Sequence, residues 1–429
     1  MYVIEVIEIQ GFWGRASASC AFDSDVNIII GRNGTGKTTF MNILNAILSV
    51  DLDGIVVESF NHVNILFKRK ELLGDQDDYL NLEVRTLEDD HQRFPNIVEY
   101  FISGETYHIR VASSQGIKQI PPVFRSRLLE EREKLKHVLS KIVALSSLSV
   151  YRLRSGEDLE LRDGRNSEYI NPVDYRLSNL LQSLTTYQLV LSQKSRAVST
   201  ELQKDVLTSI LYTEDDLDYF TPKMEFDKYQ ETRNLNNAFM RLNSYDESVR
   251  RKINFHVDSI DKSLKSIRER RYREKENVDY RAIEAFIKTQ KIIKLSLDAE
   301  EKINNIYILA DLLISTIHDF IKDKEFFYDS AGLKIQSKYG NINIDSLSSG
   351  EKQLLILLIE TVLQNGQPYV FLTDEPELSL HVEWQRKIIP AIRKLNPNAQ
   401  VIAATHSPEI ASRYREKIIH MGKIIHELP

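Results

Sequence analysis

A glycine-rich loop between an apolar strand and a helix constrains this chain more than any other feature. Residues 31–38 read Gly-Arg-Asn-Gly-Thr-Gly-Lys-Thr and match the pattern G-x-x-x-x-G-K-[ST] at every fixed position. The β-branched run Val26–Ile30 before them predicts a strand, and Thr38–Leu48 after them predicts a helix. A strand, a glycine loop and a helix in this order predict a phosphate-binding loop in an α/β fold.

The loop residues supply the groups that hold a triphosphate. Gly31, Gly34 and Gly36 have no Cβ, so the backbone can turn and bring its N–H groups close to the phosphates. Lys37 offers a mobile cation to the β- and γ-oxygens, and Thr38 offers a hydroxyl to Mg²⁺. We therefore predict that ATP is bound by Gly31, Arg32, Asn33, Gly34, Thr35, Gly36, Lys37, Thr38 and Thr39.

Two later strands also end in polar residues. The apolar run from Tyr369 ends in Asp374 and Glu375, where the first acid can hold the magnesium shell through water and the second can take a proton from attacking water. A second apolar run, Val401–Ala404, precedes His406, which would be placed to sense the γ-phosphate. We predict catalytic roles for Lys37, Glu375 and His406, and a Mg²⁺ site at Thr38 and Asp374.

The run Leu347–Gln353, which reads Leu-Ser-Ser-Gly-Glu-Lys-Gln, resembles the signature motif of ATP-binding-cassette (ABC) ATPases. Loop, signature, acidic strand and histidine follow one another in the order of that family, and all four match. In ABC ATPases the signature of one subunit closes over ATP held by another. The resemblance implies a homodimer or larger homo-oligomer joined by ATP, in which the second copy contributes Ser348, Ser349, Gly350 and Glu351.

The long gap between the motifs refines this resemblance. Lys37 and Ser348 lie 311 positions apart, as in the SMC and RecF group and the OLD (overcoming lysogenization defect) family. The segment Ile9–Arg15 is similar to their opening segment, and Asp374–His381 to the OLD pattern "DEPExxLH". The resemblance covers roughly residues 1–70 and 330–429. Ser379-Leu380-His381 replaces the D-loop aspartate of other families, and no glutamine can be assigned to the Q-loop.

The resemblance predicts an α/β fold. It would consist of an ABC ATPase head, with a P-loop core sheet and an antiparallel β subdomain, interrupted by a long helical insert. We assign residues 1–155 and 301–429 to the head and 156–300 to the insert. Leucines from Leu177 to Leu191 and isoleucines from Ile253 to Ile267 recur every seven residues, as in coiled coils. An antiparallel coiled-coil arm and a compact bundle both fit this pattern.

Composition narrows the setting of the protein. The net charge is −6, so no overall basic excess favours nucleic acid, and the charge run 268–275 fits either a solvated helix face or a local contact with DNA or an acidic partner. The single cysteine, Cys20, excludes an internal disulfide and a cysteine-built zinc site. No signal peptide and no apolar run of about 18–20 residues is evident, so we expect a cytoplasmic protein without membrane contact.

The resemblance also implies a partner. OLD nucleases carry a C-terminal Toprim nuclease domain, and the sequence after the histidine motif leaves no room for one before Pro429. We therefore expect a stand-alone ATPase that controls a separate effector, a Toprim-type nuclease, in anti-phage defence. Among such proteins, the sequence resembles first the ATPase of the PARIS system and next that of the Septu system. The alternative is a DNA-repair or chromosome-maintenance ATPase of the RecF or SMC type; in the defence reading DNA is not required.

Overall fold

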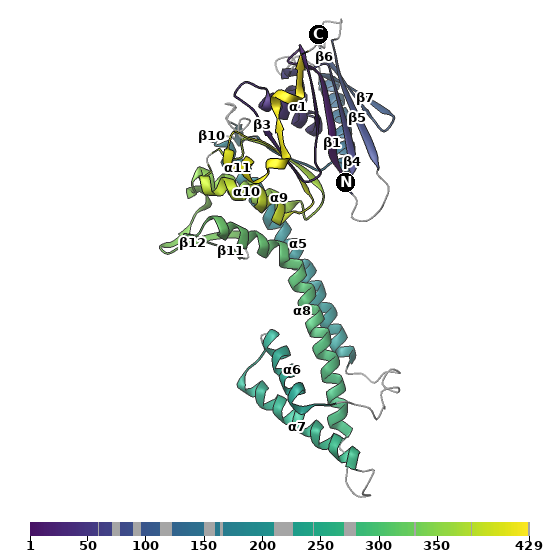
Figure 1. The fold of residues 1–429 in the computed structure, drawn as a ribbon. Coiled ribbons are helices and arrows are strands. Elements are labelled where there is room, and N and C mark those ends of the chain that lie inside the picture. The colour runs from purple at the N-terminus through teal and green to yellow at the C-terminus, as the bar shows by residue number, and fades with distance from the viewer. Residues whose placement is uncertain are drawn as a thin grey trace. The chain divides into compact units, whose positions relative to one another are not determined.

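The computed structural model describes most of the chain in two compact units (Figure 1). The first unit combines residues 1–185 with 312–429, and the second is formed by residues 186–311. These bounds differ from those of the predicted insert, residues 156–300. The assignment of that segment as a separate domain remains a prediction. The described residues are 1–58, 60–70, 78–88, 96–111, 122–149, 159–163, 166–209, 226–242, 244–269, 280–329, 332–378 and 380–427.

A five-stranded parallel sheet forms the centre of the first unit. Its strand order is β16-β3-β15-β14-β8, and each neighbouring pair runs parallel. Every residue of β14 and β15 is buried, as expected for strands covered on both faces. Because the strands are parallel, their carboxyl ends lie along one edge of the sheet. The strands are β3 (Val26–Ile30), β8 (Leu145–Ser149), β14 (Tyr369–Asp374), β15 (Ala399–Ala404) and β16 (Ile418–His420).

A seven-stranded antiparallel sheet stands beside it, with strand order β17-β2-β1-β4-β5-β6-β7. Helix α1 (Lys37–Ser49) contacts β8, β14 and β15, and the hydroxyl of Tyr100 on β6 donates to the Ile47 carbonyl at 3.2 Å. The helix therefore packs between the two sheets. The strands are β1 (Tyr2–Phe12), β2 (Ala16–Ala21), β4 (His62–Arg69), β5 (Tyr79–Glu88), β6 (Asn96–Ile102), β7 (Glu105–Val111) and β17 (Ile425–Glu427).

One strand that the sequence pattern favours is not formed. The alternating run Ile55–Glu58 predicts a strand, but residues Leu52–Val57 form helix α2, whose N-cap Asp51 accepts a hydrogen bond from the Gly54 N–H. The pattern also predicts a strand from Val150 to Leu153, which lies outside the described residues, and β8 is a described strand that joins the parallel sheet. The strands predicted before the glycine loop, before Glu375 and before His406 are present as β3, β14 and β15, and the α/β fold class is confirmed.

The remaining elements of the first unit surround these sheets. Helix α9 (Ser349–Leu363) starts within the signature run and is almost wholly buried along its apolar length. A three-stranded antiparallel sheet, β11-β12-β13, precedes it. The bounds are α4 (Pro122–Ile142), β9 (Leu159–Asp163), β10 (Asn166–Ile170), β11 (Glu325–Asp329), β12 (Gly332–Ser337), β13 (Gly340–Ile342), α10 (Val382–Leu395), α11 (Pro408–Arg413) and α12 (Met421–Ile424).

The second unit is helical. Helices α5 (Pro172–Ser209) and α8 (Tyr280–Phe320) cross the boundary between the units, and α6 (Lys228–Arg241) and α7 (Glu247–Glu269) lie within the second unit. Leu235, Ile253 and Val257 form a small core between α6 and α7. The apolar pattern from about Leu235 to Lys275 predicts one helical stretch, but the structure divides its described part into α6 and α7, so that prediction is wrong. No described helix combines the length and apolarity needed to span a bilayer.

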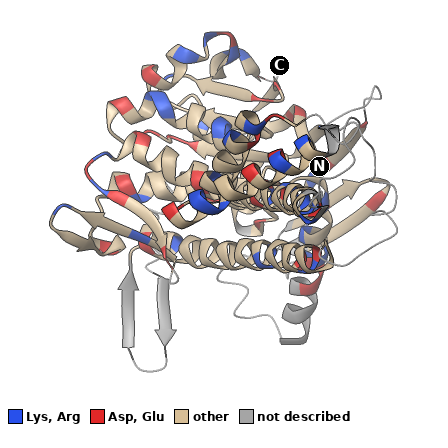
Figure 2. Ribbon diagram, turned by 90° about the horizontal axis from the view of Figure 1, so that it is seen from below, with Lys and Arg blue, Asp and Glu red and all other residues tan. Residues whose placement is uncertain are grey.

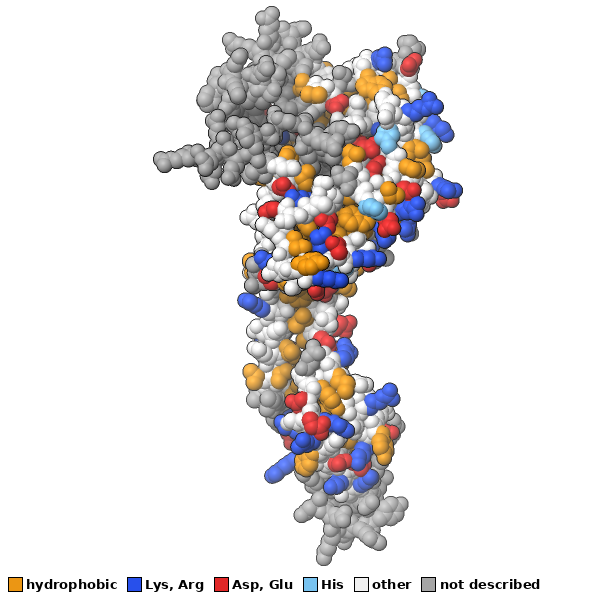
Figure 3. Space-filling view, turned by 90° about the vertical axis from the view of Figure 1, so that its left-hand side faces the viewer, with side chains coloured by type: hydrophobic (Ala, Val, Ile, Leu, Met, Phe, Trp, Pro, Cys, Tyr) orange, Lys and Arg blue, Asp and Glu red, His pale blue; other side chains and the backbone are white. Residues whose placement is uncertain are grey.

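Charges of both signs are interleaved over the described surface. Figure 2 shows Lys and Arg alternating with Asp and Glu along the helices, and the face drawn in Figure 3 mixes both signs over the second unit. Several of these side chains are paired with each other, which fits a solvated surface better than a basic groove for nucleic acid. Pairs in the second unit are Lys228–Asp258, Arg241–Glu300, Lys265–Asp261 and Lys288–Glu284.

Candidate nucleotide-binding site

Three neighbouring strands bring the predicted motifs together at one edge of the parallel sheet. The glycine loop follows β3, Glu375 follows β14, and residues 405–407 follow β15, which lies between those two strands. A cavity of about 660 Å³ opens at this edge. Its lining residues are Trp13, Asn33, Gly34, Thr35, Gly36, Lys37, Thr38, Thr39, Glu375, Leu378 and His406.

The loop has the geometry of an anion site. Gly34 and Gly36 have φ angles of 78° and 90°, which side-chain-bearing residues rarely adopt. A Cβ on Gly36 would also lie 2.6 Å from the ring of Trp13. Gly36 caps α1 without a side-chain hydrogen bond, so the first N–H groups of the helix keep their capacity to bind an anion.

Lys37 joins the loop to the histidine. Its Nζ donates to the Gly31 carbonyl at 3.1 Å and lies 2.5 Å from Nε2 of His406. An ammonium can only donate, so a hydrogen bond between these two groups requires the imidazole tautomer whose Nε2 accepts. Burial lowers the pKa of Lys37, while the carboxylates of Glu375, Asp374 and Glu377 oppose that shift. The amino group thus lies among the ends of all three strands.

Asp374 is a buried carboxylate that the protein leaves open. It is 3% exposed, and neither of its oxygens has a hydrogen-bond partner of ordinary geometry among the described residues. Burial raises its pKa, whereas the nearby Thr38 hydroxyl and Lys37 lower it. Such orphaned oxygens need an explanation, and a hydrated Mg²⁺ supplies one because that ion takes few protein oxygens and keeps several waters.

Glu375 adopts a strained backbone conformation at the strand end. Its φ is 52°, in the left-handed region, and its N–H donates to the Ala404 carbonyl at 2.8 Å. Its Oε1 lies 3.4 Å from Nε2 of His406, and its side chain is 11% exposed. Burial raises the pKa of Glu375, and the neighbouring Glu377 and Asp374 raise it further. Strain of this kind is commonly held at functional sites.

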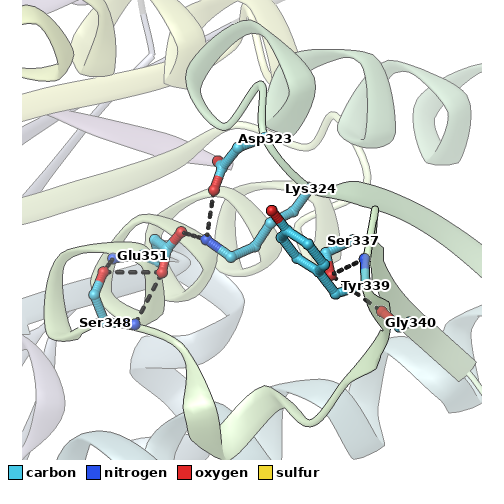
Figure 4. Close-up of polar contacts among 7 residues, drawn as sticks. All are labelled: Asp323, Lys324, Ser337, Tyr339, Gly340, Ser348 and Glu351. Carbon is cyan, nitrogen blue, oxygen red and sulfur yellow. Dashed lines mark hydrogen bonds and ion pairs between the residues drawn. The ribbon is translucent and has the colours of Figure 1, made fainter.

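The signature run lies apart from the residues that line this cavity. Ser348 caps α9: its hydroxyl accepts from the Glu351 N–H at 3.3 Å and donates to Oε2 of Glu351 at 2.9 Å (Figure 4). That same Oε2 accepts from the Ser348 N–H at 2.9 Å, which completes a capping box. Lys324 Nζ donates to Oε1 of Glu351 at 2.5 Å. Ser348 and Ser349 are exposed, and none of residues 348–351 lines the cavity at the loop.

Ion pairs connect the signature helix to the start of α5. Lys352 lies 2.7 Å from Asp174, and Arg176 lies 2.6 Å from Glu360, which is buried. Burial raises the pKa of Glu360, and Arg176 opposes that rise. These two pairs join α9 to the first turns of α5.

Two residues of the predicted loop do not line this cavity. Gly31 and Arg32 line a second cavity of about 670 Å³, together with residues of the segment that follows β15. The structure therefore brings seven of the nine predicted loop residues, with Glu375 and His406, into the first cavity, while Asp374 lies buried beside it.

Sequence reasoning gave no role to Trp13 or Glu377. Trp13 has a φ of 56°, lies against Gly36 and donates through Nε1 to Thr39 at 3.3 Å, so its indole forms one wall of the cavity. Glu377 binds the segment after β15 through several hydrogen bonds. Glu377 lies in the run Asp374–His381, which the sequence comparison singled out, but the sequence did not indicate its hydrogen-bond partners.

Comparison with known proteins agrees with this geometry. The family model described as AAA ATPase domain matches residues 1–411. The Retron Ec83 probable ATPase of Escherichia coli is 23% identical over 434 residues, which cover 94% of this chain and 68% of that protein. The Septu protein PtuA of Bacillus thuringiensis is 36% identical over 95 residues, which cover 19% of this chain and 24% of PtuA.

Among solved structures, similarity is found to the Smc head domain with an extended coiled coil, bound to the C-terminal domain of ScpA, from Pyrococcus furiosus. The identity is 14% and the TM-score 0.44, over 98% of this chain and 93% of that chain. The family match confirms the ATPase part of the resemblance inferred from the motifs. Membership of the OLD family and the PARIS likeness remain proposals.

Proposed function

Because this chain belongs to the AAA ATPase domain family, we propose that it hydrolyses ATP at the edge of its parallel sheet. One observation carries the proposal: Lys37, Glu375 and His406 come from three neighbouring strand ends and line one cavity. The uncapped N-terminus of α1 faces the same space with its free N–H groups. A triphosphate bound there would have its terminal phosphate beside a base, a cation and an imidazole.

The residues divide the chemistry among them. Lys37 and the loop N–H groups hold the β- and γ-phosphates. Water attacks the γ-phosphorus while Glu375 accepts its proton, the bond to the β–γ bridging oxygen breaks, and ADP and phosphate are formed. His406, whose Nε2 lies 2.5 Å from Nζ of Lys37, contacts the γ-phosphate, and its side chain shifts when that phosphate leaves. The indole of Trp13 closes the wall of the cavity above Gly36.

Thr38 and Asp374 fit Mg²⁺. Both present oxygen ligands, and the Thr38 hydroxyl lies near the buried carboxylate of Asp374, neither oxygen of which has a partner of ordinary hydrogen-bond geometry among the described residues. Mg²⁺, when bound, would neutralise charge on the β- and γ-oxygens.

A second copy would complete the site. Ser348 and Ser349 are exposed at the capped N-terminus of α9 and do not line the cavity of their own chain. We propose that they contact the γ-phosphate of ATP bound by the other copy, as the ABC resemblance implies. ATP then joins the two copies, and hydrolysis separates them.

The ion pairs of α9 supply a route from the site to the helical insert. Lys352 and Glu360 bind Asp174 and Arg176 at the start of α5, which continues into the second unit. We propose that closure at the signature reaches a separate effector protein by this route. The names of the retron and Septu relatives support a role in anti-phage defence. A Toprim-type nuclease, as in the PARIS system, is the proposed effector.

The alternative, a DNA-repair or chromosome-maintenance ATPase, predicts a basic groove. Described Lys and Arg side chains are instead interleaved with acids (Figures 2 and 3), and the net charge is −6. Most of the charge run 268–275 lies outside the described residues. Strong stimulation of hydrolysis by DNA would favour the alternative.

Glu375→Gln tests the proposed chemistry. The amide cannot accept the proton of water, so we expect kcat to fall about 100- to 10,000-fold while ATP still binds. A phosphate-release assay and a titration with a fluorescent ATP analogue measure the two quantities. Turnover at the wild-type rate would show that Glu375 is not the base.

A further inference from the structure

Glu377 makes an unusual set of contacts. Its Oε1 accepts from the Thr405 hydroxyl at 2.5 Å and from the backbone N–H groups of His406 and Ser407, each at 2.9 Å. The carboxylate is 9% exposed and comes from the loop after β14, whereas all three donors belong to the segment after β15. A single carboxylate oxygen thus fixes the backbone N–H groups of His406 and of Ser407, the residue that follows it.

Gln385 provides a second connection between the same two segments. It lies in the first turn of α10, and its Nε2 donates to the Leu380 carbonyl at 3.1 Å. Its Oε1 accepts from the Ser407 hydroxyl at 2.7 Å. The segment after β15 is therefore bonded on one side to Glu377 and on the other to a glutamine that is itself bonded to the Glu377 loop.

We propose that Glu377 is a positioning residue that sets the place of His406 in the nucleotide cavity. By fixing the N–H groups of His406 and Ser407, it keeps the imidazole beside Lys37 and near Glu375. The loop after β14 and the histidine then move as one body, so a shift at the acidic strand end reaches the γ-phosphate contact. The inference rests on the proposed ATPase function, because turnover is one of its readouts.

The contacts argue against the other roles open to an acid here. Glu375 lines the cavity and Glu377 does not, so Glu377 is the poorer candidate for a base. Its Oε1 already accepts three hydrogen bonds and has little capacity left for a ligand. Its Oε2 is buried and unpaired in the described residues, beside Glu375, whose pKa it helps to raise. The experiment must therefore distinguish a role of Oε2 as a metal ligand from the positioning of His406.

A double-mutant cycle between Glu377 and His406 makes that separation. Glu377→Ala removes the acceptor of the His406 N–H and one of two acceptors of the Ser407 N–H, which also donates to the Thr405 hydroxyl oxygen at 2.9 Å. We expect kcat to fall about 10- to 100-fold with little change in KM, as for residues that orient a catalytic group. His406→Ala should fall at least as far, and the double variant no further. Glu377→Gln keeps a carbonyl oxygen at the same reach and should recover most of the turnover.

Three results would overturn the inference. They are wild-type kcat in Glu377→Ala, a double variant slower by the product of both single losses, or Glu377→Gln as slow as the alanine variant. Thr405→Val removes one donor and keeps the fold testable if Glu377→Ala is unstable; we expect a loss of less than tenfold that vanishes in the His406→Ala background. Thermal unfolding and binding of a fluorescent ATP analogue confirm that each variant is folded.

A spectroscopic readout separates this inference from the proposed function. The imidazole signal of His406, assigned by its loss in His406→Ala, should shift or broaden in Glu377→Ala and stay near its wild-type position in Glu377→Gln. An unchanged signal in Glu377→Ala would refute the positioning role even in a protein without turnover. Wild-type turnover in His406→Ala would instead refute the proposed role of the histidine while this signal still tests Glu377.

Discussion

Helices α1 and α9 both begin at sites proposed to meet a phosphate, yet their N-termini are built in opposite ways. Gly36 caps α1 with no side-chain bond, and the free N–H groups open into the cavity. Ser348 and Glu351 cap α9 with a complete capping box, which Lys324 holds through an ion pair. The first helix end has unsatisfied donors without a ligand, whereas at the second the capping box already occupies the Ser348 hydroxyl and the Glu351 N–H.

This difference predicts an order of events. A phosphate at α1 gains hydrogen bonds that nothing else supplies, so the loop should bind ATP in a single copy. At α9 a phosphate would have to draw the Ser348 hydroxyl away from Glu351, so contact there adds less free energy. The signature should therefore bind only a nucleotide already held by another copy.

Lys37→Met should produce the largest change on the α1 side. It removes the charge-assisted contact to the phosphates, so we expect ATP affinity to fall about 10- to 100-fold, the equivalent of roughly 1.5–3 kcal/mol. Lys70→Met is the matched control, because Lys70 is a half-buried lysine that, like the buried Lys37, donates to backbone carbonyls, here those of Ser24 and Asn398. Equal losses in both variants, measured by titration, would show that the effect is not specific to the loop.

Lys324→Met should produce a small change on the α9 side. Lys324 and the Ser348 groups hold the pKa of Glu351 below its usual value, against the effect of burial. A lowered pKa stabilises the folded state above the unfolded pKa, about 4.3, and that contribution is lost as pH falls through the folded value. We expect the first turn of α9 to lose about 0.5 kcal/mol near pH 7 and less near pH 4.

Amide hydrogen exchange of residues 349–352 measures this loss. Lys394→Met is the control, since the ion pair that Lys394 makes with Asp319 is exposed and longer, at 3.4 Å. A Lys324→Met effect that grew as the pH fell would contradict the assigned ion pair.

Local sequence patterns were enough to predict the site residues that lie at or directly after the end of a strand. The run 26–38 carries its strand, loop and helix in sequence, and Asp374 and Glu375 end an apolar run, so their meeting place followed from parallel topology. Glu377 could not be found in this way, because its three partners lie 28 to 30 positions further along the chain. Trp13 and Thr39 are similarly separated, by 26 positions.

Two errors had local causes that the sequence did contain. The β-branched pair Val56-Val57 favoured a strand, but Asp51 caps a helix start through Gly54. The break between α6 and α7 is set by Asp246, whose carboxylate accepts from the Val249 N–H at 2.7 Å. In both places the capping aspartate outweighed the apolar pattern that follows it.

Mixing two inactive variants tests most directly whether one ATP is held by two copies. Lys37→Met lacks a working loop, and Ser348→Arg places a large cation where the signature would meet the phosphate but should leave ATP affinity within about twofold of wild type. Each should hydrolyse ATP poorly alone. Random pairing in an equal mixture forms one intact composite site in half of the dimers, so turnover should recover to about a quarter of the wild-type value. A mixture as inactive as its components, or full activity of Ser348→Arg alone, would contradict the account.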